Sequence, residues 1–262
     1  MRPNLDNHDY LTQQPTRTKR WLHRVFDYTS PMSPRPQLEH GQDRRDLGRY
    51  SIPQAAAFIG VPPRTMRRWF LGDKRLFKPS YHYRTDVLLS FNDVTEAYII
   101  EVLRNHYDYS PRRLRAVVEG LRKSSRLERP LAQREFYAIP EFQSLVDRRV
   151  QRGTQVNIDY AHHGNLVFDP FVTALGKRIE RDSKGRAVRI YPSRDAESED
   201  VPVSMDPDVL SGELVISGTR IPVAMLYAKK LDGKTVKEIA ISYHLEPELI
   251  TKVLNHFERE KP

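Results

Sequence analysis

Four side chains in one short stretch of the sequence have the chemistry of nucleic-acid recognition. At helical spacing, Arg64, Thr65, Arg67 and Arg68 fall together on one side of a helix. Arginine can donate two parallel hydrogen bonds to guanine, so an arginine-lined helix is suited to the major groove of DNA. The stretch therefore predicts a DNA-reading helix. The competing interpretation is a solvated basic face, because arginine is common on exposed helices and many helix pairs of this kind bind only protein.

The residues around this basic face predict two short helices joined by a tight turn. Ser51 and Gln54 have the spacing of a capping box, which satisfies the free amides where a helix begins. Gly60 and Val61 supply the turn, and the two prolines at 62–63 can occupy only the opening of the second helix. The apolar residues expected to face inward from the second helix, and the glycine expected to end it, are Met66, Trp69, Phe70 and Gly72.

Basic residues continue after the second helix. Residues 73–84 mix cations with aromatic side chains, which is typical of a short wing-like hairpin or loop that touches phosphates, and Lys74, Arg75 and Arg84 are its candidate contacts. A long helix is expected from Ser90, which can cap it together with Asp93, and another from Ser110-Pro111 with a strongly basic outer face. That outer face is either solvated or an extension of the DNA footprint.

The positive charge of the protein lies in its front part. The whole chain has a net charge of +9, yet residues 201–262 carry eight Lys or Arg against nine Asp or Glu. The remaining residues carry 35 against 25. Polyanion binding is therefore expected ahead of residue 200 and protein contact behind it.

Several classes of function find no support in the sequence. No run approaches the roughly 20 apolar residues of a membrane helix, and the absence of cysteine fits a reducing cytoplasm. His162 and His163 have no third metal ligand at a suitable spacing, and no nucleophile motif or phosphate loop is found. We expect a cytoplasmic protein that is not an enzyme, with no catalytic residues, metal or cofactor.

Composition divides the chain into five segments. Apolar and polar residues alternate around 156–160, which predicts a strand. Residues 178–191 predict a hairpin, and residues 168–175 predict a turn or two of helix. The expected class is mainly α with small β elements (α+β). The segments are a largely disordered N-terminal arm (1–48), a helix-turn-helix domain (49–128), a mixed strand and hairpin region (129–191), an acidic linker (192–204) and a C-terminal domain (205–262).

One short stretch of the N-terminal arm, residues 19–26, differs from its surroundings, and we call it the arm island. Its apolar residues follow the spacing of an amphipathic helix, and we expect it to dock on the body of the protein. Folding against a partner and running as a basic arm along DNA are the alternatives. The apolar residues are Trp21, Leu22, Val25 and Phe26, and the cations around them are Lys19, Arg20 and Arg24.

The last segment predicts three helices, over residues 223–231, 235–243 and 247 to about 260, packed as a bundle. Thr235 and Glu238 have the spacing of a capping box at the start of the second helix. Glu246 and Glu248 at the start of the final helix would repel phosphates, so a protein or dimer surface is preferred here to a second DNA-reading unit. The candidate residues for toxin binding or dimerisation are Tyr227, Tyr243, Leu249, Ile250, Val253 and Phe257.

Two parts of the sequence resemble known families. The helix pair at 50–72, the basic loop and the Leu89-Ser-Phe91 entry to the long helix resemble MerR-type winged helix-turn-helix proteins, although Trp69 stands where many members have tyrosine. Residues 211–223 and 232–240 resemble a small bacterial domain that was first catalogued as of unknown function and recurs in antitoxins. Together they resemble VapB-type antitoxins of type II toxin–antitoxin modules.

This resemblance implies a homodimer that binds operator DNA as an autorepressor. It also implies that the dimer neutralises a PIN-like ribonuclease toxin encoded by an adjacent gene. The alternative is a stand-alone MerR-like transcription regulator that senses a small ligand through residues 130–200.

Overall fold

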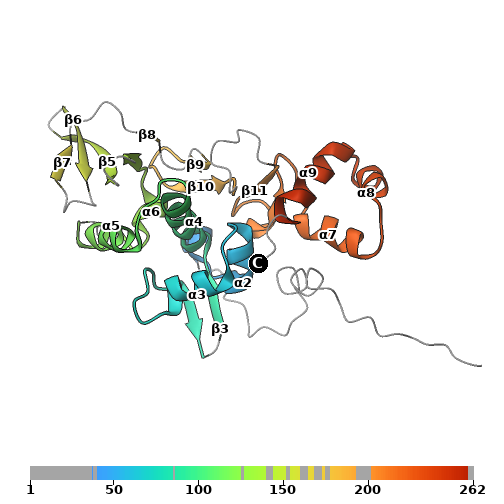
Figure 1. Cartoon of the computed structure of the whole chain (residues 1–262), viewed down its shortest axis with the longest axis horizontal. Coiled ribbons are helices and arrows are strands. Elements are labelled where there is room, and N and C mark those ends of the chain that lie inside the picture. The colour runs from blue at the N-terminus through green and yellow to red at the C-terminus, as the bar shows by residue number, and fades with distance from the viewer. Residues whose placement is uncertain are drawn as a thin grey trace, which may run out of the picture.

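The protein has a mixed helical and sheet architecture of the α+β class (Figure 1). The computed structural model describes residues 37, 40–84, 86–124, 127–139, 144–151, 154–159, 165–167, 173–174, 178–192 and 202–258. The arm island at 19–26 and the pair His162-His163 lie outside these residues. Within the described part of the chain, no helix is long and apolar enough to cross a membrane.

The front part begins with a two-helix unit and a hairpin. Ser51 caps the first helix by accepting a hydrogen bond from the Gln54 amide, and the Gln54 side chain accepts from the Ser51 amide in return, as the sequence predicts. Tyr50 pairs with Leu89, so the strand before the helices joins the hairpin after them. The elements are η1 (Arg44–Asp46), β1 (Tyr50–Ser51), α2 (Ile52–Phe58), α3 (Pro63–Leu71), β2 (Tyr81–Tyr83) and β3 (Asp86–Leu89), with sheet order β1-β3-β2.

A long buried helix forms the centre of the front part. In α4 (Phe91–Asn105) every residue from Phe91 to Glu101 is buried, so this helix is covered on all sides over three turns. Ser90 and Asp93 form its predicted capping box. Two further helices follow, α5 (Pro111–Ser124) and α6 (Pro130–Gln133).

The middle of the chain forms an antiparallel five-stranded sheet of order β7-β6-β5-β4-β8. The expected strand around 156–160 is β6, whereas the helical expectation for 168–175 is wrong at its described positions, which form β8 and pair with β4. Backbone pairing with a distant strand overrides the local pattern there. The strands are β4 (Tyr137–Ile139), β5 (Ser144–Gln151), β6 (Thr154–Asp159), β7 (Asn165–Val167) and β8 (Thr173–Ala174).

A second sheet has the strand order β12-β11-β10-β9. Its strands come from both sides of the acidic stretch that the sequence predicts as a linker. The predicted hairpin contributes two strands, and Ile190 pairs with Met205 on the far side of the acidic stretch. Val203 and Ser204 are therefore strand residues rather than linker, and the expected hairpin region shares its sheet with the C-terminal part. The strands are β9 (Ile179–Arg181), β10 (Ala187–Ile190), β11 (Val203–Met205) and β12 (Leu214–Ile216).

The C-terminal part ends in three helices that contact one another. Thr235 caps the second of them with Glu238, as the sequence predicts, and His244 ends it in the left-handed conformation. A short turn, η3 (Leu210–Gly212), precedes β12. The helices are α7 (Val223–Leu231), α8 (Val236–Tyr243) and α9 (Pro247–Glu258).

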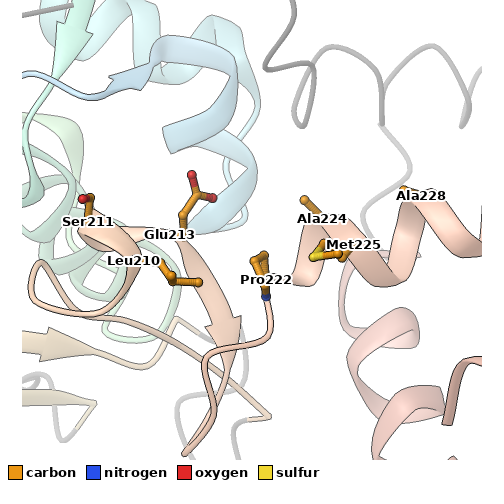
Figure 2. Close-up of a pocket in the computed structure, with 7 residues that line it drawn as sticks. All are labelled: Leu210, Ser211, Glu213, Pro222, Ala224, Met225 and Ala228. Carbon is orange, nitrogen blue, oxygen red and sulfur yellow. The ribbon is translucent and has the colours of Figure 1, made fainter. Parts of the chain in front are cut away.

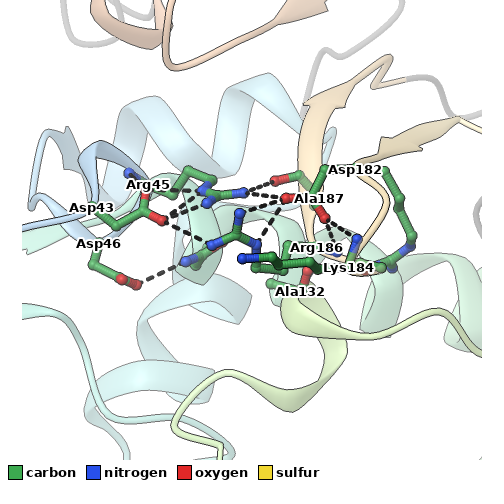
Figure 3. A network of polar contacts seen from close by, with 11 residues as sticks. Asp43, Arg45, Asp46, Ala132, Asp182, Lys184, Arg186 and Ala187 are labelled. Carbon is green, nitrogen blue, oxygen red and sulfur yellow. Dashed lines mark hydrogen bonds and ion pairs between the residues drawn. The ribbon is translucent and has the colours of Figure 1, made fainter.

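Polar contacts hold the front part on the second sheet. Arg45 of η1 donates to Asp43 at 2.8 Å and reaches Asp182 of the β9–β10 turn at 3.5 Å (Figure 3). The Arg45 guanidinium keeps the pKa of the Asp43 carboxyl below its usual range. The Tyr50 hydroxyl donates to the Gly212 carbonyl oxygen at 2.8 Å, and both partners are buried. The two-helix unit is thus fixed to the turn that opens the C-terminal part.

Candidate nucleic-acid interface

Helix α3 has two chemically distinct faces. Met66 and Phe70 are fully buried and Trp69 is 5% exposed, so one face forms part of the core. Arg64, Arg67 and Arg68 are exposed, and Thr65 is half-buried beside them. The buried face holds the helix in place, and the arginines are left at the surface.

The buried face of α3 is held by several contacts. The guanidinium carbon of Arg104, on α4, lies 5.9 Å from the centre of the Trp69 ring, within the range of a cation–π interaction. The backbone amides of Leu76 and Phe77 both donate to the Trp69 carbonyl oxygen, at 2.8 and 3.0 Å. The loop after α3 is therefore folded back onto the helix.

The arginines of α3 surround a hollow of about 510 Å³. It is lined by Arg64, Thr65, Arg67 and Arg68 together with Leu71 and Gly72. Gly72 is the C-cap that the sequence predicts, but its φ of −69° is extended rather than left-handed. A glycine fits because a Cβ at this position would lie 2.7 Å from the Arg68 carbonyl oxygen. The structure thus brings all four predicted side chains of α3 to one place.

The other three predicted cations lie on the segments that follow α3. Lys74 and Arg75 are exposed in the loop whose end is fixed by Leu76, and Arg84 is exposed at the turn of the β2–β3 hairpin with a φ of +52°. Figure 1 shows this hairpin running beside α3 on the same side of the molecule. These three cations are therefore not part of the hollow of α3, because the described residues that line it all lie between Arg64 and Gly72.

The segment from Arg49 to the turn of the β2–β3 hairpin is far more basic than the chain as a whole. Residues 49–84 contain eight Lys or Arg and a single acid, Asp73. Arg49 and Lys78 belong to this set and were not among the predicted site residues, although the charge count of this segment would have found them. A strongly positive surface of this kind attracts polyanions.

An ion pair inside the front part positions the start of the hairpin. Arg129 contacts Asp93 with its Nε at 2.5 Å and donates to the Lys78 carbonyl oxygen at 2.9 Å. Asp93 accepts from the Ser80 amide at 2.8 Å. The sequence offers no signal for this contact because Arg129 and Asp93 are 36 positions apart.

Glu96 lies in the same interior. It is 1% exposed, its Oε1 accepts from the Leu131 amide at 3.0 Å, and burial raises its pKa to about 8. The side chain is therefore mostly protonated at pH 7, which lowers the cost of placing a carboxyl group in the core.

The candidate residues of the C-terminal part mostly pack within the chain itself. Tyr227, Ile250 and Val253 are buried, and the Tyr227 hydroxyl donates to the Leu254 carbonyl oxygen at 2.7 Å. Tyr243 and Leu249 are half-buried against the same core, and the side chain of Phe257 lies outside the described part of the structure. In a single chain these residues join α7, α8 and α9, and the large apolar side chains left exposed among the described residues are Met225 and Ile241.

The described residues contain no group of three or more His, Asp or Glu arranged to hold a metal ion.

Comparisons with known proteins extend the description of the fold. Residues 203–256, from β11 into α9, match the family described as "Protein of unknown function (DUF433)". No curated protein matches the sequence. The crystal structure of Rv2018 from Mycobacterium tuberculosis is similar, with a TM-score of 0.55 and 18% identity over 81% of this chain and 100% of that chain. At this identity the likeness concerns the fold alone.

Proposed function

We propose that this protein binds duplex DNA through α3 and the hairpin that follows it, and holds a protein partner with its C-terminal part. The observation that carries the DNA-binding role is the two-faced helix α3, whose arginines Arg64, Arg67 and Arg68 are exposed while its other face is packed in the core. A helix that is firmly held and presents arginines is suited to direct reading of base edges.

In this proposal, α2, α3 and the β2–β3 hairpin act as a MerR-like winged helix-turn-helix. The four side chains of α3 read bases in the major groove, and Lys74, Arg75 and Arg84 contact phosphates. A homodimer presents two copies of α3 to two half-sites about one helical turn apart. Each phosphate that is neutralised contributes about −0.9 to the slope of log affinity against log salt concentration.

The second part of the proposal is an antitoxin role in the cytoplasm. The resemblance of residues 211–223 and 232–240 to a domain of VapB-type antitoxins supports it, and so does the near-zero net charge of the C-terminal part, which suits a protein partner better than DNA. The helices α7, α8 and α9 then act as a three-helix bundle that dimerises and holds a PIN-like ribonuclease toxin encoded by an adjacent gene. The dimer represses its own operator.

A pair of matched double variants tests both roles. Arg67→Ala/Arg68→Ala removes two charges from α3, and Lys229→Ala/Lys230→Ala removes two exposed charges from α7. Anisotropy titration with DNA from upstream of the gene should show that the α3 variant loses roughly 30-fold or more in affinity, because two bidentate arginine–base contacts at about 1–3 kcal/mol each amount to about 2–6 kcal/mol. The α7 variant should stay close to wild type.

Both variants should still co-purify with the product of the neighbouring reading frame. Equal loss of DNA binding in the two variants would contradict base reading by α3, and loss of both DNA and partner in the α3 variant would contradict the separation of roles. A chain that binds DNA but captures no neighbouring product would favour the stand-alone regulator.

A further inference from the structure

A largely apolar groove of about 590 Å³ lies between η3 and α7 in the C-terminal part (Figure 2). Leu210 and Glu213 lie on one side, Ala224, Met225 and Ala228 lie on α7, and Pro222 lies between them. Met225, on the α7 wall of this groove, is 46% exposed. Among the described residues that line the groove, the charged one is an acid, Glu213.

The η3 wall of this groove is already shaped in the structure. Leu210, Ser211 and Gly212 have φ angles of 45°, 60° and 88°, so three consecutive residues are left-handed, and two of them carry side chains that disfavour this conformation. The buried hydrogen bond from Tyr50 to the Gly212 carbonyl oxygen holds the turn in place. A wall fixed in advance lowers the entropic cost of binding a segment against it.

The N-terminal segment joins the body beside this wall. Arg44 lies 3.8 Å from Asp208 across an ion pair, and Asp43, Arg44, Pro207 and Asp208 line one small hollow. Six residues later, Tyr50 contacts Gly212. Residues 43–50 therefore run alongside residues 207–212, so the start of the front part lies within a short stretch of chain from the groove wall.

We infer that this groove is the docking site of the arm island at residues 19–26. The island supplies an apolar stripe, Trp21, Leu22, Val25 and Phe26, which matches the apolar walls, and three cations that complement Glu213 in charge. Phe26 and Arg44 are eighteen positions apart, and a chain of that length spans up to about 60 Å. A tether this short raises the local concentration of the island to about the millimolar range.

The size of the groove also favours a short segment over a folded partner. Its volume is that of a pocket for a small molecule or a few side chains. A stable protein–protein interface buries about 800 Å² on each partner, mostly on larger and flatter surfaces. Docking of the island covers Met225 and places Lys19, Arg20 or Arg24 beside Glu213.

Cysteine pairs in the full-length chain test this inference directly, because the protein has no cysteine of its own. Val25→Cys is combined with Ala228→Cys, at the exposed edge of the groove, or with Ser242→Cys, an exposed control position on α8. A disulfide requires Cβ atoms about 3.5–4.5 Å apart. Mild oxidation followed by non-reducing electrophoresis and mass spectrometry should give an intrachain disulfide with position 228 in about tenfold or greater excess over position 242.

Leu22→Cys, three positions earlier on the same apolar stripe, serves as a second probe. It can reach position 228 if Val25→Cys does not face it. Equal cross-linking to positions 228 and 242, or none with either probe, would overturn the inference. A disulfide that forms only between chains would assign the groove to a second copy of the protein.

Hydrogen exchange provides an independent readout on the intact fold. The amides of α7 from Val223 to Ala228 should exchange faster in Trp21→Ala than in the wild-type chain, because the variant loses the largest side chain of the stripe. Identical exchange in the two chains would overturn the inference. Protection of these amides that develops only when the product of the neighbouring frame is bound would assign the groove to that partner instead.

Discussion

Replacing Glu96 with glutamine should change how the stability of the protein depends on pH. In the folded chain, burial raises the pKa of this carboxyl from 4.5 to about 8. Between these two values the folded state keeps a proton that the unfolded state has released. The contribution of this group to the free energy of unfolding is therefore greatest below about pH 4.5, and it falls as the pH rises towards 8.

The size of the effect follows from the two pKa values. One pKa unit corresponds to about 1.4 kcal/mol, so this carboxyl alone should lower the free energy of unfolding by about 4 kcal/mol between pH 5 and pH 9. Glutamine retains an oxygen that can accept from the Leu131 amide, and it does not ionise. Glu96→Gln should therefore lose this slope and be more stable than the wild-type chain at pH 9.

Urea unfolding followed by circular dichroism from pH 5 to pH 9 measures the difference. Glu119→Gln, which removes an exposed carboxyl from α5, is the matched control and should keep the wild-type pH dependence. Parallel pH profiles for Glu96→Gln and the wild-type chain, or a Glu96→Gln variant that is the less stable of the two at pH 9, would refute the reasoning.

Of three further predictions, two concern the joint between the two-helix unit and the C-terminal part, and the third concerns the cap of α2. Tyr50→Phe should lower the free energy of unfolding by roughly 1–2 kcal/mol, measured by urea titration, because the buried Gly212 carbonyl loses its donor. Gly212→Ala should cost roughly 2–4 kcal/mol, since its φ is 88° and a Cβ would lie 2.1 Å from the Tyr50 hydroxyl oxygen. Part of that cost should disappear in the Tyr50→Phe background, and strictly additive costs in the double-mutant cycle would contradict the contact. Ser51→Ala should cost about 1 kcal/mol by removing the N-cap of α2, and an unchanged thermal midpoint would show that the cap contributes nothing.

The parts of the fold that depend on nearby residues could be predicted from the sequence. The capping boxes at Ser51, Ser90 and Thr235 form as expected, because a cap involves residues only one helical turn apart. The range expected for the first C-terminal helix is the observed range of α7. The arginines of α3 share one face for the same reason, since helical spacing alone fixes their side of the helix.

The parts that depend on distant partners could not be predicted in this way. Ile190 and Met205 pair across a stretch whose acids and prolines are typical of a linker, and Tyr50 contacts Gly212 from 162 positions away. Short strands take their partners from the tertiary fold, so their local sequences carry little information about pairing. The burial of Tyr227 among α7, α8 and α9 likewise depends on how three helices meet.

The most direct test of the central claim is to ask which helix lies against the DNA. A hydroxyl-radical probe attached to Arg64→Cys, at the start of α3, is compared with the same probe on Glu248→Cys, at the exposed start of α9. With DNA from upstream of the gene, the α3 probe should cleave at two sets of positions about one helical turn apart, and the α9 probe should give only background cleavage. Localised cleavage from α9, with none from α3, would contradict the account.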